Sequence, residues 1–252
     1  MKILITNDDG IRAQGINSLY KALSEKWDVV MVAPHQERSS CGHGITLGQP
    51  VRITKISESI YDCTGMPADC ILIGLGHIMK DSKPDLVISG INHGANLGQD
   101  RFYSGTMAAA REATFKGIPS IAISLVTGHR DEYEHFESAC QVIVDLLERN
   151  IQEYIPHMGM LNINVPNLAM EDIAGYKDSF AGFQVYSEKV IERVDARGKD
   201  YFWIGGIHSG HQDIPGSDCN WVNQGHVSLD LHDVSGKCSK YEQNLNEVIK
   251  KL

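Results

Sequence analysis

Two adjacent carboxylates near the start of the chain are the residues best suited to do chemistry. Asp8 and Asp9 follow a short apolar run at 3–5 and precede Gly10. Two neighbouring acids repel each other, and a divalent cation is the simplest group to offset their charge because hard cations bind oxygen ligands. The Asn-Asp-Asp-Gly motif at 7–10 is also good turn chemistry, and taken alone it favours a solvated turn.

A glycine- and asparagine-rich stretch at 89–106 is the second candidate for chemistry. Its glycines are interspersed with Asn92, Asn96 and Asp100. Glycine permits positive φ angles and exposes backbone N–H groups, while amide oxygens can bind a hard metal and amide donors can bind phosphate. The stretch matches neither a Walker A loop nor the Gly-x-Gly-x-x-Gly fingerprint, which argues against a nicotinamide dehydrogenase.

An alanine-rich segment at 107–116 predicts a helix that ends at Gly117. Ser104, Gly105 and Thr106 would then lie at the helix N-terminus, where the helix dipole and unpaired N–H groups favour an anion. An ordinary capped helix after a glycine-rich loop fits the same residues.

These candidate residues need elements to position them, and strand-like runs alternate with helix-like runs through the first 166 residues. The expected strands cover 3–5, 28–33, 51–56, 60–64, 85–89, 120–124 and 160–165. The expected helices cover 16–23, 68–79, 107–116 and 133–149. This alternation predicts a doubly wound, mostly parallel α/β sheet, with Asp8 and Asp9 at the carboxyl end of its first strand, where such sheets bind ligands.

The pattern changes after residue 166. Residues 183–194 alternate like an exposed antiparallel strand, and shorter strands are expected at 201–205 and 226–231 with a polar loop at 208–224 between them. The tail at 239–252 can form a terminal helix. We therefore expect one domain over 1–252, in which 1–166 form the core. Residues 167–252 form a peripheral, antiparallel extension that docks on another subunit, because such elements bury little surface alone.

The composition restricts the class of partner. The chain has 252 residues, of which 42% are hydrophobic and 22% charged, and its net charge of -9 argues against binding to nucleic-acid polymers. No stretch approaches a membrane span and the N-terminus is no secretory signal, so we expect a cytoplasmic protein. The six cysteines form no Cys-x-x-Cys pair, and no His-Glu-x-x-His motif supports a zinc hydrolase.

Several motifs in the same order and spacing give a resemblance to a known family. They are Asn-Asp-Asp-Gly at 7–10, Arg-Ser at 38–39, Gly-Met-Pro-Ala-Asp-Cys at 65–70, Ser-Gly-Ile-Asn at 89–92 and Tyr-Ser-Gly-Thr at 103–106. Residues 161–166 and 225–229 fit a later strand and a C-terminal signature. Over nearly the whole chain, the sequence resembles the SurE family of acid phosphatase-like nucleotidases.

The resemblance implies a Rossmann-like core and a divalent-metal-dependent activity that removes phosphate from nucleoside 5′- and 3′-monophosphates. Some family members also trim short polyphosphate. The family's metal ligands fall on Asp8, Asp9, Ser39 and Asn92, which would hold one Mg²⁺ or Mn²⁺ per subunit. The family also implies a homodimer or homotetramer built by exchanged C-terminal elements.

We assign catalytic roles to Asp8 and Asp9, which would anchor the cation. A water activated by the cation is the favoured nucleophile, and attack by Asp8 itself stays open. The residues expected to hold phosphate are Asn96, Ser104, Gly105 and Thr106. His43 could approach the nucleoside but fits a solvated loop histidine equally well, and Arg101 and Tyr103 are weaker candidates.

Two positions depart from the family pattern. Ser40 stands where the family usually has a glycine, which predicts a narrower loop or a different backbone conformation. Residues 228–232 read Ser-Leu-Asp-Leu-His where the family usually has Ser-x-Thr-Pro-Leu, which affects the oligomer arm more than the chemistry. The alternatives are a broad phosphomonoesterase or exopolyphosphatase, and a metal- or nucleotide-binding regulatory protein without catalysis.

Overall fold

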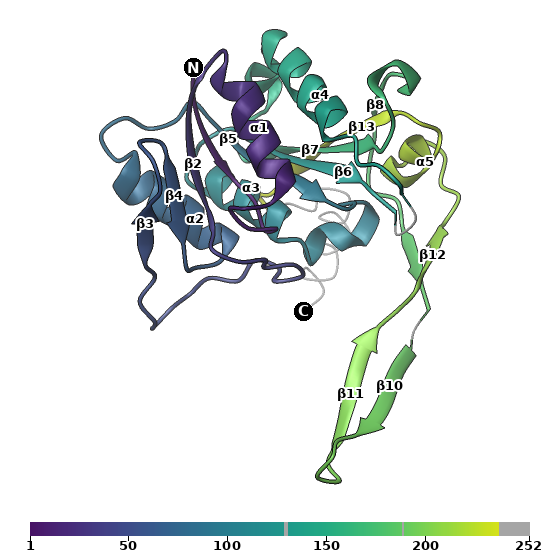
Figure 1. The fold of residues 1–252 in the computed structure, drawn as a ribbon. Helices are drawn as coiled ribbons and strands as arrows, with labels where there is room; N and C mark the ends of the chain where they lie inside the picture. The colour runs from purple at the N-terminus through teal and green to yellow at the C-terminus, as the bar shows by residue number, and fades with distance from the viewer. Residues whose placement is uncertain (129–130, 188, 237–252) are drawn as a thin grey trace, which may run out of the picture.

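A nine-stranded sheet forms the centre of the molecule, in the order β3-β4-β2-β1-β5-β6-β7-β13-β8 (Figure 1). The computed structural model describes residues 1–128, 131–187 and 189–236. The sheet comprises β1 (Lys2–Thr6), β2 (Asp28–Pro34), β3 (Ile53–Lys55), β4 (Ile60–Cys63), β5 (Leu86–His93), β6 (Ser120–Val126), β7 (Gly159–Pro166), β8 (Tyr176–Asp178) and β13 (Val227–Asp233). From β4 to β7 in this order all neighbours pair in parallel, which confirms the predicted α/β class.

Helices cover both faces of this sheet. They are α1 (Gln14–Ser24), α2 (Pro67–Ile73), α3 (Gly105–Phe115), α4 (Phe136–Glu148) and α5 (Asp218–Asn223). A π-helical turn η1 (Gly74–Ile78) extends α2, and the short 3₁₀ turns are η2 (Gly98–Phe102), η3 (Ile151–Tyr154) and η4 (Met170–Asp172). The helix expected at 68–79 is therefore an α-helix only as far as Ile73, and the one expected at 133–149 begins at Phe136.

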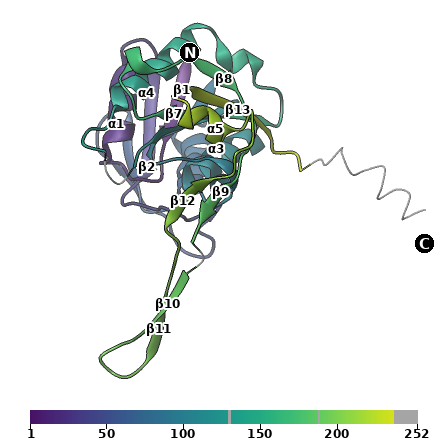
Figure 2. The ribbon, with the colours of Figure 1, turned by 90° about the vertical axis from the view of Figure 1, so that its right-hand side faces the viewer.

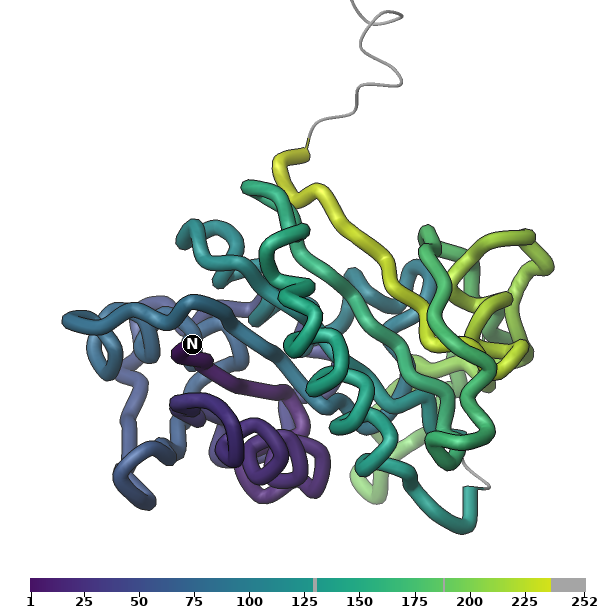
Figure 3. Tube along the Cα trace, turned by 90° about the horizontal axis from the view of Figure 1, so that it is seen from above, coloured from purple at the N-terminus to yellow at the C-terminus, as the bar shows by residue number. Residues whose placement is uncertain are grey.

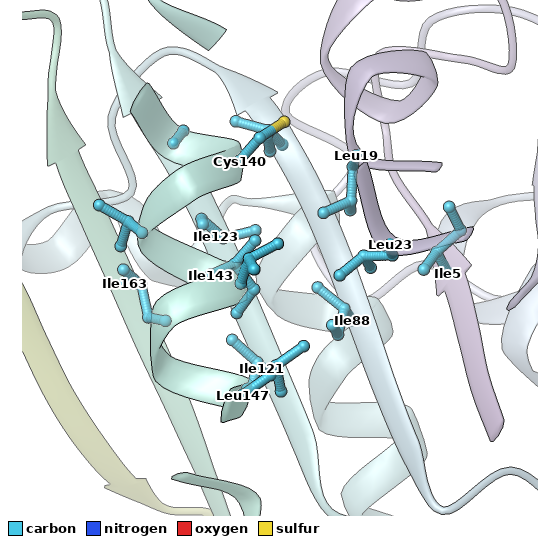
Figure 4. Close-up of a cluster of buried hydrophobic side chains, with 14 of the residues drawn as sticks. Ile5, Leu19, Leu23, Ile88, Ile121, Ile123, Cys140, Ile143, Leu147 and Ile163 are labelled. Atoms are coloured by element: carbon cyan, nitrogen blue, oxygen red, sulfur yellow. The ribbon is translucent and has the colours of Figure 1, made fainter. Parts of the chain in front are cut away.

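The core consists of two main apolar layers, one on each face of the sheet. Because successive strand side chains point to opposite faces, Ile3 and Ile5 of β1 join the layer under α1 and α4, whereas Leu4 joins the layer under α2 and α3. Figure 4 shows the first layer, where Leu19 and Leu23 of α1 point toward the sheet. This double layer fixes the strands rigidly, so residues at the strand ends are held in place.

The chain beyond Pro166 differs from the sequence-based expectation. The predicted single strand at 183–194 is two strands, β9 (Gln184–Tyr186) and β10 (Lys189–Val194). They pair antiparallel with β12 (His208–His211) and β11 (Asp200–Gly205), respectively. The predicted loop at 208–224 therefore contains β12 and α5. We call residues 189–205 the arm, which projects from the rest of the molecule in Figures 1 and 2.

The strand expected at 226–231 is not peripheral. It is β13, which runs antiparallel to β7 within the central sheet, and Figure 3 shows the yellow β13 beside the green β7. Val227 and Ser228 are buried there. Asp230 is buried too, and an ion pair with Arg101 offsets its charge. The terminal helix predicted at 239–252 lies outside the described residues. Among the described residues, no helix is long and apolar enough to span a membrane.

Candidate active site

The predicted metal ligands meet at one edge of the sheet. Asp8 and Asp9 follow β1, Ser39 follows β2, and Asn92 lies near the end of β5. The strands β2, β1 and β5 are neighbours and run in parallel, so their carboxyl ends lie side by side. The fold therefore brings the four residues to the position where open parallel sheets bind ligands.

Asp8 is the most enclosed of the four, with 4% of its surface exposed. Its Oδ1 accepts a hydrogen bond from the Thr106 hydroxyl, and its backbone oxygen accepts one from the Arg38 N–H at 2.7 Å. Burial raises the pKa of Asp8, and the hydrogen bond from Thr106 opposes that rise. A buried carboxylate with a raised pKa is a group that gains from a nearby positive charge.

The pKa of the neighbouring Asp9 is raised as well. Burial and, next, the charge of Asp8 raise the pKa of Asp9 to about 6. Its Oδ2 accepts the backbone N–H of His93 at 3.1 Å, which favours the ionised form and partly offsets the rise. Burial and mutual repulsion therefore disfavour the doubly ionised form of this pair unless a positive charge lies nearby.

Two neutral oxygen donors stand beside the acids. The Asn92 amide nitrogen donates to the Gly94 carbonyl at 2.8 Å, which leaves the Asn92 side-chain oxygen as its other polar atom. The exposed Ser39 hydroxyl donates to Glu37 at 2.6 Å and keeps oxygen lone pairs for a further partner. Across the described residues no cluster of three or more His, Cys, Asp or Glu is built to hold a metal, so a cation here needs Ser39 and Asn92 besides the acids. This donor set, all oxygen, fits a hard divalent cation.

The N-terminus of α3 is pressed against Asp8. A Cβ atom added at Gly105 would lie 2.7 Å from the Asp8 Cβ and 2.9 Å from the Cys41 Sγ, so only glycine fits there. The helix expected at 107–116 is α3, which begins at Gly105, and the Ser104 side chain caps it by accepting the Met107 N–H at 3.1 Å. The backbone amides of Gly105 and Thr106 also lower the pKa of Asp8, so the N-terminus of this helix stabilises the Asp8 carboxylate.

A cavity of about 1040 Å³ opens beside the acids. Five of the predicted site residues line it, namely Asp8, Ser39, Asn92, Asn96 and Ser104. Four do not belong to its wall, namely Asp9, His43, Gly105 and Thr106. The volume is within the range of small-molecule sites, and the polar residues at its inner end leave room for an anionic group.

The structure gives two of the predicted substrate-binding residues other partners. Thr106 has no exposed surface, and its hydroxyl is bound to Asp8 rather than turned to the cavity. His43 bonds Glu112 through Nε2 at 3.1 Å and stacks on Phe115, with ring centres 5.9 Å apart. Both side chains therefore hold neighbouring residues of the protein. Asn96 does line the cavity, and its amide nitrogen donates to Ser124 at 2.8 Å.

Of the two weaker candidates for substrate binding, only Tyr103 lines the cavity. Arg101 is buried and bonds Asp230 at 2.9 Å and the Gly98 carbonyl at 2.6 Å, so it holds the loop against β13 and does not face the cavity wall. Tyr103 does line the cavity, with 65% of its surface exposed.

The outer wall of the cavity comes from residues that sequence reasoning missed. We call residues 184–187, 189–190 and 204–208 the arm base. Its members in the wall are Tyr186, Ser187, Lys189, Val190, Ile204, Gly205 and Gly206. Gln99 clamps this segment to the glycine–asparagine loop, because its side chain donates to the Gln184 carbonyl at 2.7 Å and accepts the Gln184 N–H at 2.8 Å. Gln99 and Gln184 are 85 positions apart, so no local sequence pattern predicts that they pair.

Similarity to known proteins agrees with the motifs and the geometry. The family model described as "Survival protein SurE" matches residues 3–188. The chain is 44% identical to the "5'-nucleotidase SurE" of Geotalea daltonii over 91% of both chains. It is 42% identical to the protein of that name from Vibrio cholerae, over 91% of this chain and 90% of the other. The crystal structure of the SurE protein from Aquifex aeolicus superposes with a TM-score of 0.87 at 38% identity, covering 99% of this chain and 100% of that one.

Proposed function

The chain belongs to the SurE family, and from this premise we propose that it is a divalent-metal-dependent phosphohydrolase that removes phosphate from nucleoside 5′-monophosphates and also from 3′-monophosphates. One observation carries the proposal. Asp8 and Asp9 are adjacent, largely buried carboxyl groups whose pKa values are both raised, and Asp8 lines a cavity large enough for a nucleotide. Such a pair is costly unless a cation offsets it, and a cation beside a cavity can receive a phosphate.

The proposed cation is one Mg²⁺ or Mn²⁺ per subunit, held by Asp8, Asp9, Ser39 and Asn92. When bound, it supplies positive charge next to the phosphoryl oxygens and makes a water molecule more acidic. The oxygen-only donor set favours these hard cations over zinc or copper.

The protein's own residues position the reacting groups. Asn96 and Ser104 line the cavity next to Asp8 and would donate hydrogen bonds to the phosphate. Thr106 and Gly105 would act through Asp8 and not on the substrate, because they hold Asp8 in place and lower its pKa. We favour water over Asp8 as the nucleophile, since one Asp8 oxygen already accepts the Thr106 hydroxyl and the other is needed for the cation. Tyr103 and the arm base would receive the nucleoside.

Phosphate release from a panel of substrates tests the proposal. The panel contains 5′- and 3′-nucleoside monophosphates, p-nitrophenyl phosphate and short polyphosphate, each with Mg²⁺, Mn²⁺ or EDTA. We expect metal-dependent release from the nucleotides, abolished by Asp9→Ala and retained by Asp81→Ala, which removes an exposed acid elsewhere. Equal release from all phosphomonoesters would favour the broad phosphatase. Bound metal without any turnover would favour a binding protein.

A second experiment separates two roles of Asp8. If Asp8 only binds the cation, Asp8→Asn should lose metal affinity and activity together, as measured by calorimetric Mn²⁺ titration and phosphate release. Loss of activity with metal affinity intact would contradict a purely ligating role and support nucleophilic attack by Asp8.

We also propose that the protein is a homodimer or homotetramer whose contacts include the arm. Every residue of both arm strands is exposed, yet the strands carry large apolar side chains such as Trp203 at 64% and Ile204 at 89% exposure. An exposed two-stranded ribbon with this composition is marginal alone and gains stability from a second copy. Light scattering should give a dimer or tetramer mass, and Trp203→Asp with Ile204→Asp should lower it. A strictly monomeric mass for the unmodified chain would refute this proposal without bearing on the chemistry.

A further inference from the structure

A second cavity, of about 500 Å³, lies away from the acid pair. Its wall includes Lys83, which precedes β5, and Ile118, which precedes β6. It therefore lies at the amino ends of these strands, whereas Asn92 is near the carboxyl end of β5. Along β5, the six residue steps from Leu86 to Asn92 span about 20 Å at the rise of a parallel strand. The second cavity is thus independent of the proposed active site.

The floor of this second cavity is apolar. Leu72 and Leu75 come from α2 and the π-helical turn η1, and Ile118 joins them from the turn before β6. Leu75 belongs to the buried layer under α2 and α3, and Ile118 packs against that layer. An apolar group placed here would extend the existing core instead of meeting water. A π-helical turn beside a cavity is a further unusual feature, because such turns are rare and frequently occur at functional sites.

Three lysines, Lys80, Lys83 and Lys116, complete the wall, and no acidic residue belongs to it. Lys116 has a structural explanation, since it pairs with Glu112 at 3.2 Å at the end of α3. Within the described part of the chain, neither Lys80 nor Lys83 has a hydrogen-bond or ion-pair partner. Unpaired lysines around an apolar floor are a notable concentration of positive charge in a chain of net charge -9.

We propose that this second cavity binds a small amphiphilic anion, with a doubly charged phosphate- or phosphonate-type head between Lys80 and Lys83 and an apolar body on Leu72, Leu75 and Ile118. Two ammonium groups match a doubly charged head better than a singly charged one. The cavity volume accommodates a body of several carbon atoms. The inference does not depend on the proposed phosphohydrolase activity.

Isothermal titration with n-hexylphosphonate tests the site, because a phosphatase does not cleave its carbon–phosphorus bond. The titration is done in EDTA, so that no cation recruits the phosphonate to the acid pair, and at about pH 9, where the phosphonate carries two charges and lysine is still protonated. The test variant is Lys80→Gln with Lys83→Gln. The matched control is Lys21→Gln with Lys55→Gln, which removes the same charge from exposed positions elsewhere.

The test variant should bind n-hexylphosphonate about 5- to 30-fold more weakly than the unmodified protein, as expected for the loss of two partly exposed ion pairs. The control variant should bind within twofold of the unmodified protein. Inorganic phosphate, which lacks the body, and hexane-1-sulfonate, which has one charge, should both bind more weakly than n-hexylphosphonate. Equal weakening in both variants would overturn the proposal, as would inorganic phosphate binding as tightly as n-hexylphosphonate.

Mass spectrometry of lysine acetylation locates the bound probe directly. Saturating n-hexylphosphonate should slow the acetylation of Lys80 and Lys83 at least fivefold and leave Lys21 unchanged. Unchanged labelling of Lys80 and Lys83 at saturation would place the probe elsewhere and refute the site. Because the readout is local and needs no turnover, it does not depend on whether the protein hydrolyses nucleotides.

Discussion

Asp9→Asn should make the metal-free protein more stable at neutral pH while removing its response to metal. The carboxyl and the amide have nearly the same shape, and an asparagine oxygen can still accept the His93 N–H that Asp9 accepts at 3.1 Å. The substitution therefore removes mainly a negative charge that is largely buried beside Asp8. The Asp9 carboxylate, which we propose as a cation ligand, is thus expected to lower the free energy of unfolding when the cation is absent.

The magnitude follows from the pKa of Asp9, which rises from 3.8 to about 6 on folding, mainly through burial and then through repulsion by Asp8. The folded state thus binds this proton more tightly than the unfolded state does. The resulting stability is present below pH 3.8 and is lost as pH rises through about 6. Above that pH the ionised group costs at most about 3 kcal/mol, because each pKa unit corresponds to about 1.4 kcal/mol. At pH 4.5 the cost shrinks to about 1 kcal/mol.

Urea unfolding in EDTA at pH 4.5 and 7.5 measures this difference. Asp9→Asn should exceed the wild type by up to about 3 kcal/mol at pH 7.5 and by about 1 kcal/mol at pH 4.5. Asp81→Asn, at an exposed position, should change stability little at either pH. Added Mg²⁺ should stabilise the wild type and leave Asp9→Asn unchanged. A variant less stable than wild type at pH 7.5, or a difference independent of pH, would refute the reasoning.

Three further substitutions test individual features of the structure. Thr106→Val removes the hydroxyl that lowers the pKa of Asp8. We therefore expect kcat/KM to fall about tenfold and the acidic limb of its pH profile to move to higher pH, and an unchanged profile would contradict this. Ser40→Gly should raise the free energy of unfolding in urea by about 1 kcal/mol, because Ser40 has a φ of 56°, and a lower free energy would show that its side chain is needed. Glu112→Gln weakens the contacts to His43 and Lys116 and should cost about 1–3 kcal/mol in thermal unfolding, whereas an unchanged Tm would mean that these contacts contribute nothing.

The inner end of the site could be predicted because its determinants are local. Asp8 and Asp9 come shortly after a β-branched strand, and Asn92 lies near the end of another strand, which begins with an apolar run. Once the alternation of strands and helices gives a parallel sheet, strand ends meet at one edge without further information. The departure at Ser40 was also informative, since Ser40 has a φ of 56°, a conformation that glycine adopts more readily than serine.

The partners of individual side chains could not be predicted. A hydroxyl at a helix N-terminus suits a phosphate and a carboxylate equally, and only the close approach of Gly105 to Asp8 shows which one Thr106 meets. Likewise, Asp230 looks like a surface acid until Arg101, 129 positions away, is found beside it. Such pairings depend on how distant segments pack, and a local sequence pattern carries no record of that packing.

The two ends of the cavity therefore have different origins, with different consequences for function. The inner end rests on strands β1 and β5, which are fixed by apolar layers on both faces of the sheet. The outer end is the arm base, which is joined to the glycine–asparagine loop by the Gln99–Gln184 clamp and by a hydrogen bond from Tyr186 to Asp100. A displacement of the arm would reach the outer wall through these contacts while the acid pair stays on its strands. If the proposed function holds, chemistry and substrate selection are carried by separate parts of this fold, and only the second is tied to the surface that we propose for assembly.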